Sequence, residues 1–482
     1  MNNILLVYPK TGLDIKNVFT KPPLSFLALA PYLLEKGFSV KIIDQRVDSD
    51  WKGQLYENLR NRPLCVGISS MSGPQIAYGL VISRMVKDFC ARIPVVWGGA
   101  HPTILPEQTL QSPYIDIVVA GEGEETFSET AQALSRGKEL DKVKGIYFKK
   151  DGKPIFSGYR ELLDINTLPP MPYHLVDIDN YVLTSVLGKR NLMIVPDRGC
   201  PMRCGFCSVP HFYRYKVRLA RPEKIIEDIK SVMKFGVDTV DIGSENFFPN
   251  KQRVKDFCRL VKKEKLNIQL RAECRADYIL EYDDALLKLM REAGFIALQI
   301  GAESGSNRIL ELMNKGITVE QTKEADRKLK RAGIAGLYSF MIGFPGETLE
   351  DVQRTVDLAI QLADNNAMAR TYNLQIYKPF PATALYERCL EYGFQEPESL
   401  EGWSHILDVK QAWLSARERR LLKMLDLFSY FFDEKGIGEF LNNRFISTFL
   451  LPYSKFVKFR CKNAYYNLLL EYPLVNLLKR YT

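Results

Sequence analysis

The sequence predicts an α/β protein with a doubly wound N-terminal sheet, a partial (β/α)6 barrel and a helical C-terminal region. In residues 1–140, short runs rich in Val and Ile alternate with helical stretches, and the alternation resumes after a Pro-rich linker. After about Pro379 the strand pattern fades, and Trp413–Phe432 has a helical pattern. A chain of 482 residues is too long for one ordinary core. We expect four segments, 1–140, 141–190, 191–380 and 381–482.

The first segment has five predicted strands, "NILLVYP", "FSVKIID", "LCVGISS", "IPVVWGG" and "IDIVVAGEGE", with helices such as Pro23–Lys36 and Pro74–Ala91 between them. Ligands of such sheets bind beyond the carboxyl ends of the strands. Here those ends carry Gly- and Ser-rich loops, which are either tight turns or a ligand site. We predict a ligand site at this edge. Its candidate residues are Ser69, Ser70, Gly98, Gly99, His101, Gly121 and Gly123.

Residues 145–158 have the pattern of a hairpin with Asp151-Gly152 at its turn. A linker with three prolines follows, and then six strand-and-helix steps. The predicted strands are "LMIVPDRG", "VDTVDIGS", "LNIQLRAE", "FIALQIGAES", "IAGLYSFMIGFPG" and "TYNLQIYKP". Six such steps predict a partial barrel with its functional groups at the C-terminal ends of the strands.

Three of the nine cysteines lie within eight residues of "RGCPMRCGFCSVP", directly after the first barrel strand. The other six are scattered, which argues against a disulfide framework. A structural zinc ion needs a fourth ligand, and only His211 is near. An iron–sulfur cluster held by three thiolates leaves one iron open for chemistry.

The spacing Cys-x-x-x-Cys-x-x-Cys, with the aromatic Phe206 before the last Cys, resembles the cluster motif of the radical S-adenosylmethionine (radical SAM) enzymes. The resemblance implies a 4Fe–4S cluster on Cys200, Cys204 and Cys207, with the amino and carboxylate groups of SAM as the missing ligand. Reductive cleavage of SAM would give a 5′-deoxyadenosyl radical. The resemblance also implies an external electron donor of the flavodoxin or ferredoxin type.

Other loops match this family at single positions. "DIGSEN" resembles the loop that meets the amino group of SAM and contains Glu245, although it departs from the usual Gly-Gly-Glu form. Arg275 follows the third barrel strand and is either a partner of the SAM carboxylate or a solvated arginine. Glu303 follows the fourth strand, where the family often contacts the ribose. "MIGFPGET" closes the fifth strand and would flank the adenine, or is simply a turn.

The N-terminal segment resembles the cobalamin-binding domains of radical SAM enzymes in "PPLSFLALAPYLLEKGFSVKIID", "GGAHPT" and "GEGEETF". Some cobalamin proteins bind cobalt with a His in an Asp-x-His-x-x-Gly loop after the first strand, but here that loop reads "PKTGLDIKNVF". We therefore expect no protein ligand to cobalt. We expect His101, the one histidine of the segment, to organise a loop or contact the nucleotide tail of the cofactor.

Together the two resemblances imply a cobalamin-dependent radical SAM enzyme that transfers a methyl group to an unreactive carbon of a small molecule. The alternative is an oxidative cyclisation or rearrangement with the same cofactors. Methylthiotransfer to tRNA would need three further cysteines in the front domain, which has only Cys65 and Cys90. A non-catalytic cobalamin or redox sensor has no need of an open iron.

The net charge of +9 is concentrated at the C-terminus, where residues 441–482 hold seven Lys or Arg and one acid. The rest is nearly neutral, which argues against a nucleic-acid-binding body. No apolar run reaches the ~20 residues that span a bilayer, and the start is not typical of a signal peptide, so we expect a cytoplasmic protein.

The C-terminal tail mixes aromatic, Leu and basic residues. It is either a helical cap over the barrel, which we favour, or an interfacial helix on an anionic membrane. The second alternative places the protein peripherally at the inner membrane face. It would also make the substrate a lipid or a tetrapyrrole.

Overall fold

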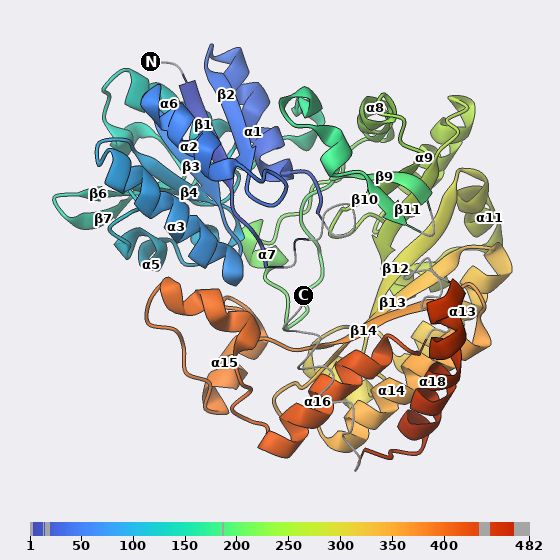
Figure 1. Cartoon of the computed structure of the whole chain (residues 1–482). Coiled ribbons are helices and arrows are strands. Elements are labelled where there is room, and N and C mark those ends of the chain that lie inside the picture. Colours follow the sequence, from blue (N-terminus) through green and yellow to red (C-terminus); the bar gives the residue numbers. More distant parts are fainter. Residues whose placement is uncertain (1–2, 13, 15–19, 186–187, 433–443, 467–482) are drawn as a thin grey trace.

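The computed structural model describes residues 3–12, 14, 20–185, 188–432 and 444–466. Two seven-stranded sheets lie side by side, each with helices packed against it (Figure 1). The last helices of the chain continue along the second sheet, and residues 401–408 before them reach back to the first domain. The α/β class and the division into a front domain, a partial barrel and a helical end are as predicted.

The first sheet is parallel over five strands, and its apolar runs are buried on both faces, as expected for a doubly wound sheet. An antiparallel hairpin extends one edge, and Asp151 and Gly152 occupy its turn with φ of 52° and 76°. The strands lie in the order β2 (Ser39–Asp44), β1 (Asn3–Tyr8), β3 (Cys65–Ser69), β4 (Val95–Gly98), β5 (Ile117–Val119), β6 (Ile146–Lys150) and β7 (Lys153–Phe156).

The second sheet has six parallel strands that neighbour one another in sequence order, which is the arrangement of a partial barrel. A short antiparallel strand precedes them at the edge. The order is β14 (Arg370–Ile376), β13 (Ala335–Ile342), β12 (Phe295–Glu303), β11 (Gln269–Cys274), β10 (Thr239–Ile242), β9 (Gly188–Ile194) and β8 (Leu183–Ser185).

The helices connect these parallel strands. Those of the front domain are α1 (Leu24–Glu35), α2 (Trp51–Arg60), α3 (Pro74–Phe89), α4 (Ala100–Ile104), α5 (Pro106–Gln111) and α6 (Glu124–Ser135). Those of the barrel are α7 (Val209–Phe212), α8 (Pro222–Met233), α9 (Lys251–Lys263), α10 (Ala276–Glu281), α11 (Asp284–Glu292), α12 (Asn307–Leu312), α13 (Val319–Ala332) and α14 (Leu349–Asn365). The C-terminal helices are α15 (Ala384–Glu391), the 3-10 helix η5 (Glu401–Asp408), α16 (Ala416–Ser429) and α18 (Arg444–Lys462).

The C-terminal region holds the two halves together. Trp403 of η5 is fully buried, and its Nε1 donates to Oε1 of Gln108 in the front domain at 2.6 Å. The described part of the tail packs on the outer helix α14, where Lys458 and Lys462 pair with Asp364 at 2.9 and 2.8 Å. It lies on the outside of the barrel there, and residues 467–482 are outside the described part. Among the described helices, none combines the length and apolarity needed to cross a membrane.

Candidate functional site

A cavity of about 240 Å³ opens where the front domain meets the barrel. The carboxyl ends of the front strands supply Ser69, Gly98, Gly99, Gly121 and Gly123 to its lining, five of the predicted residues. The glycines leave room: a Cβ on Gly98 would approach no atom closer than 3.7 Å, and one on Gly121 would meet nothing within 4 Å. The barrel contributes Arg198, Phe212 and Tyr213. The predicted sheet edge is therefore one wall of a shared cavity.

Ser70 and His101 do not line this cavity but lie behind it. Both are fully buried, and Nδ1 of His101 lies 2.8 Å from Oγ of Ser72. The imidazole ring is 5.8 Å from the ring of Trp403, and burial lowers the pKa of His101 to about 4. Its Nε2 has no hydrogen-bond partner among the described residues. His101 is thus a neutral side chain between the glycine loops and η5.

Ion pairs join the cavity wall to the cysteine loop. Arg198, two residues before the first Cys of the loop, pairs with Glu122 at 2.5 Å and also with Glu124. Arg218 pairs with the same Glu122 at 2.7 Å and donates to the carbonyl of Leu163. All four charged side chains are at most 16% exposed. The loop between β5 and α6 is therefore fastened to the barrel at the point where the cluster motif begins.

The cysteine loop follows β9 and is shaped by contacts on both sides. Gly199 has φ of +86°, and a Cβ there would lie 2.2 Å from the carbonyl oxygen of Lys216, so only glycine fits. Gly205 donates to the carbonyl of Met313 at 2.7 Å and accepts from Leu385 of α15 at 2.8 Å. The three thiols are free and half-buried. Burial raises the pKa of Cys207 to about 11, and the neighbouring Cys204 and Cys200 contribute to this rise.

Acidic and basic side chains at the ends of β10, β11 and β12 lie around these thiols. Glu245 accepts a hydrogen bond from the backbone of Gly199 at 3.3 Å. Arg275 is 8% exposed, pairs with Asp277 at 2.9 Å and donates to the carbonyl of Lys315 at 2.8 Å, so it is not a solvated arginine.

Glu303 lies at the end of β12 with φ of +60° and pairs with Lys315 at 2.6 Å. The ammonium group of Lys315 also lies 5.7 Å from the centre of the Phe206 ring. Phe206 and Glu303 therefore both contact Lys315 beside the cysteine loop.

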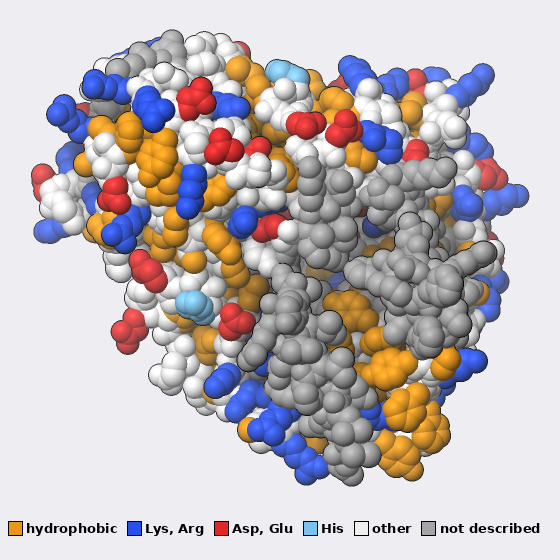
Figure 2. All heavy atoms as spheres, viewed as in Figure 1, with side chains coloured by type: hydrophobic (Ala, Val, Ile, Leu, Met, Phe, Trp, Pro, Cys, Tyr) orange, Lys and Arg blue, Asp and Glu red, His pale blue; other side chains and the backbone are white. Residues whose placement is uncertain are grey.

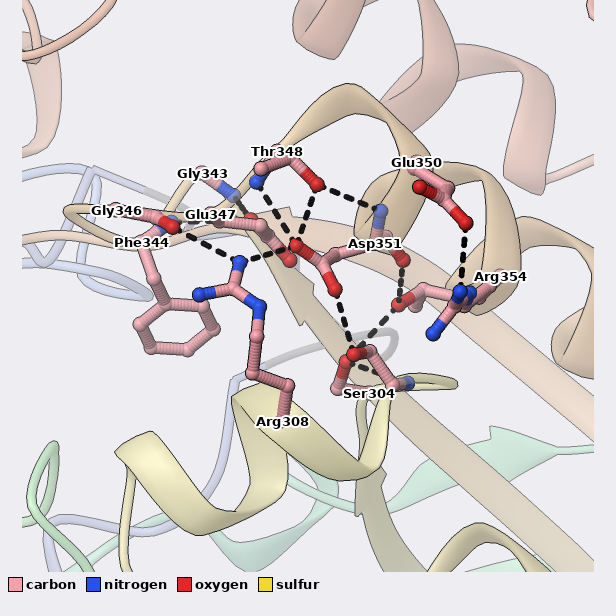
Figure 3. A network of polar contacts seen from close by, with 12 residues as sticks. Ser304, Arg308, Gly343, Phe344, Gly346, Glu347, Thr348, Glu350, Asp351 and Arg354 are labelled. Carbon is pink, nitrogen blue, oxygen red and sulfur yellow. Dashed lines mark hydrogen bonds and ion pairs between the residues drawn. The ribbon is translucent and has the colours of Figure 1, made fainter.

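The loops after β12 and β13 form one polar network (Figure 3). Asp351 accepts from Ser306 and from both the amide and hydroxyl of Thr348, and pairs with Arg308. Glu347 accepts from the amides of Gly343 and Phe344. Burial raises the pKa of Glu347 to about 8. This network fixes the "MIGFPGET" turn that the sequence placed at the end of the fifth strand.

Comparison with known proteins supplies the family. Residues 194–359 match the model of the Radical SAM superfamily, and residues 13–131 match the B12 binding domain. An uncharacterized methyltransferase of Pyrococcus horikoshii is 34% identical over 80% of this chain and 82% of its own length. The chain belongs to the cobalamin-dependent radical SAM enzymes.

This radical SAM enzyme is also similar to a cyclase in sequence and to a solved cobalamin-dependent enzyme in structure. The anaerobic magnesium-protoporphyrin IX monomethyl ester cyclase of Rubrivivax gelatinosus is 29% identical over 76% of this chain, which spans 66% of the cyclase. The solved structure of the cobalamin-dependent radical SAM enzyme OxsB with aqua-cobalamin superposes with a TM-score of 0.78 at 19% identity. That match covers 100% of this chain and 75% of OxsB. The structural likeness concerns the fold.

The residues of this radical SAM enzyme fit its cofactors, which are a 4Fe–4S cluster, SAM and cobalamin. The side-chain amide of Asn246 lies 3.4 Å from Sγ of Cys200, as a donor to a thiolate would. Among the described residues, no three Cys, His, Asp or Glu converge as ligands of a single ion. Each protein-bound iron of a four-iron cluster binds its own thiolate, so the cysteines of such a cluster lie farther apart than the ligands of a single metal ion. Gly98 and Gly121 leave the sheet edge of the cavity open, and no histidine is among its lining residues.

Sequence reasoning missed the residues that link these sites. No motif quoted from the sequence contains Lys315 or Arg218. No role was given to four residues inside the quoted motifs, which are Asn246, Arg198, Glu122 and Glu124. Charged residues within the motif loops themselves, such as Glu122 and Glu124 of "GEGEE", were the available signal.

Proposed function

We propose that this enzyme transfers a methyl group from SAM to an unreactive carbon of a small molecule. SAM on the cluster supplies a hydrogen-abstracting radical, and cobalamin supplies a methyl carrier. The proposal needs the two cofactor sites to face each other. The observation that carries it is the shared cavity, in which Gly98 and Gly121 of the front domain lie opposite Arg198 and Tyr213 of the barrel.

The chain's own residues have distinct roles in this proposal. Cys200, Cys204 and Cys207 hold the cluster, and Glu245, Arg275, Glu303 and Phe206 lie around the place where SAM binds. Ser69, Gly98, Gly99, Gly121 and Gly123 form the wall against cobalamin, with Ser70 and His101 supporting the loops from behind. Arg198 holds the cluster loop against the cavity wall through Glu122 and Glu124.

A cyclisation with the same cofactors is the second candidate, favoured by the likeness to the anaerobic cyclase. The methyltransferase relative has the higher identity and is matched over more of its own length, which supports methyl transfer. Methylthiotransfer has less support, because the described front domain offers only the buried Cys65 and the half-buried Cys90 as thiols.

Methyl-deuterated SAM distinguishes the two candidates. The reconstituted enzyme is incubated anaerobically with cobalamin, a reductant and the small-molecule extract of the cells that make it. Methyl transfer moves the label intact into one product, which gains the mass of a trideuteriomethyl group. A product that loses hydrogens and gains no label would instead identify a cyclase.

We also propose a reductant of the flavodoxin or ferredoxin type, because no second three-thiol group accompanies the cysteine loop in the described residues. Purified flavodoxin and its reductase should replace a chemical reductant in SAM cleavage. A cleavage rate no higher than with the reductase alone would reject this donor.

Membrane contact is proposed for α18 and the residues just after it. Phe456 and Phe459 of the helix and Tyr465 beyond its end are 53%, 57% and 58% exposed, and Figure 2 shows an apolar patch over this helix. The exposed Lys455 lies beside them. Such a face suits an anionic interface. The full chain should sediment with anionic vesicles, less so at high salt, and Phe456→Ser with Phe459→Ser should abolish this. Equal sedimentation of that variant would place the contact elsewhere.

A further inference from the structure

The loop after β10 brings a side-chain amide against the cysteine loop. Nδ2 of Asn246 lies 3.4 Å from Sγ of Cys200 and 3.1 Å from the hydroxyl oxygen of Tyr278 on α10, so each of the two amide hydrogens has an acceptor. Asn246 is 4% exposed and Tyr278 is 7% exposed. The amide is therefore directed at the thiol in a place that excludes most of the solvent.

A buried arginine holds the two partners of this contact in place. Arg253 of α9 donates to the carbonyl of Phe247, the residue after Asn246, at 2.8 Å. It also pairs at 2.5 Å with the fully buried Asp197, which precedes Cys200 by three residues. Since one guanidinium group binds both segments, the amide and the thiol have a fixed relative position.

Helix α10 holds the same loop from another side. Tyr282, which follows the helix, is buried and donates to the carbonyl of Phe248 at 2.7 Å. Tyr278, one helical turn earlier, accepts from Asn246. These two contacts lie on either side of the fully buried Phe247, so the loop has little freedom to turn the amide away from the thiol.

The three thiols of the cysteine loop have different surroundings. Burial raises the pKa of Cys207, and a hydrogen bond from the backbone of Val209 opposes this rise. Burial also raises the pKa of Cys204, where the charge of Lys315 opposes it. In the described part of the chain, Asn246 is the one side chain that donates a hydrogen bond to a thiol of this loop. The first cysteine therefore has a donor of its own.

We propose that Asn246 is a positioning residue that raises the reduction potential of the 4Fe–4S cluster by its hydrogen bond to the thiolate of Cys200. Reduction adds one electron from the external donor, and no bond in the protein forms or breaks. Hydrogen bonds to the sulfur ligands and solvent exposure both set the potential of such clusters. A donor stabilises the more negative, reduced form, and low exposure strengthens this effect. The proposal holds for methyl transfer and for cyclisation alike.

A redox titration of the cluster tests this proposal. The full chain is reconstituted with iron and sulfide, without cobalamin, and the reduced cluster is followed by electron paramagnetic resonance. Asn246→Leu removes both amide hydrogens at nearly the same side-chain size. We expect its midpoint potential to fall by about 59 mV or more, which is a tenfold change in the one-electron reduction equilibrium. Its iron content should match that of the unsubstituted protein.

Two further variants serve as controls. Asn373 of β14, at the edge of the sheet opposite to β9, donates to Asp426 of α16 at 2.9 Å. Asn373→Leu therefore removes an amide of the same kind away from the cysteine loop and should leave the potential unchanged. Tyr278→Phe removes the acceptor of the second amide hydrogen but keeps the donor to Cys200. It should lower the potential by less than Asn246→Leu does.

A spectroscopic signature reports the hydrogen bond itself. In protein labelled with ¹⁵N at the side-chain amides of asparagine, pulsed electron paramagnetic resonance of the reduced cluster should detect a ¹⁵N coupling. The coupling should be absent from Asn246→Leu and present in Asn373→Leu. If Asn246→Leu binds less iron than the unsubstituted protein, the coupling in the unsubstituted protein and in Asn373→Leu decides.

Three results would overturn the role given to Asn246. The first is a midpoint potential of Asn246→Leu equal to that of Asn373→Leu. The second is a reduced cluster without ¹⁵N coupling in the labelled, unsubstituted protein. The third is a Tyr278→Phe protein whose potential falls as far as that of Asn246→Leu, which would assign the effect to the tyrosine hydroxyl.

Discussion

The guanidinium group of Arg198 and the carboxylate of Glu122 form a 2.5 Å ion pair across the boundary between the front domain and the barrel. Their side chains are 12% and 5% exposed. Arg198 precedes the first cysteine of the cysteine loop by two residues, and Glu122 lies between two glycines that line the cavity. The pair therefore sets the position of the cysteine loop relative to the wall of the shared cavity.

Replacement of Arg198 should cost far more stability than replacement of an exposed arginine. After Arg198→Met, Glu122 and Glu124 stay buried, and the guanidinium group of Arg218 is the one that remains to pair with them. Breaking a buried pair costs about 3–5 kcal/mol. Arg190→Met is the control, because its pair with Asp179 is 42% and 71% exposed and should cost about 0–1 kcal/mol. Urea denaturation measures both, and equal losses would contradict the role given to Arg198.

The cysteine loop should account for all of the bound iron. Anaerobic reconstitution should give about four irons per chain, the content of one 4Fe–4S cluster. Cys200→Ala, Cys204→Ala or Cys207→Ala should reduce the iron content to near zero. Cys90→Ala, which removes a half-buried thiol of the front domain, should leave it unchanged. Full iron content in a variant lacking all three loop cysteines would refute the assignment.

A side chain grown from Gly98 should block cobalamin without disturbing the cluster. A Cβ on Gly98 is in ordinary contact with Val119 at 3.7 Å, so the backbone tolerates it, and the rest of a leucine enters the cavity. Gly98→Leu should therefore bind hydroxocobalamin at least tenfold more weakly, as read from the visible spectrum. The same residue placed on an exposed helix position, Glu57→Leu, should bind normally. Unchanged affinity of Gly98→Leu would place the cofactor elsewhere.

Glu347 should give the protein a pH dependence that a glutamine removes. Its folded pKa of about 8 exceeds the ordinary value of 4.5, so the folded state keeps a proton that the unfolded state releases. The resulting stabilisation is complete below the unfolded pKa and is lost as the pH rises through about 8. The Tm of Glu347→Gln relative to the unsubstituted protein should therefore increase between about pH 5 and pH 8.5. A constant difference would show that the carboxyl is not protonated in the folded state.

Local patterns predicted the fold well because each strand and each turn is encoded by neighbouring residues. The apolar runs became the parallel strands, and Asp151-Gly152 became the hairpin turn. The cluster motif is also local, since three thiols within eight residues must share a loop. The partners of Arg198 and Glu303 were not predictable in this way. Arg198 meets Glu122 across 76 positions of the chain, and Lys315 meets Glu303 only because α12 turns back toward β12.

His101 shows the same limit. Its place in the loop after β4 was clear from the sequence, but its contact with Trp403 depends on a segment 300 positions later that reaches back to the front domain. The roles of His101 and of the other proposed cofactor-contacting residues remain predictions.

The most direct test of methyl transfer is the ratio of the two small products formed from SAM with the natural substrate. Each turnover of a methyltransferase of this kind consumes one SAM as methyl donor and one as radical source. S-adenosylhomocysteine and 5′-deoxyadenosine should therefore form in roughly equal amounts, quantified by mass spectrometry against the methylated product. Formation of 5′-deoxyadenosine with substrate conversion but without matching S-adenosylhomocysteine would contradict methyl transfer and identify a cyclase or another rearrangement.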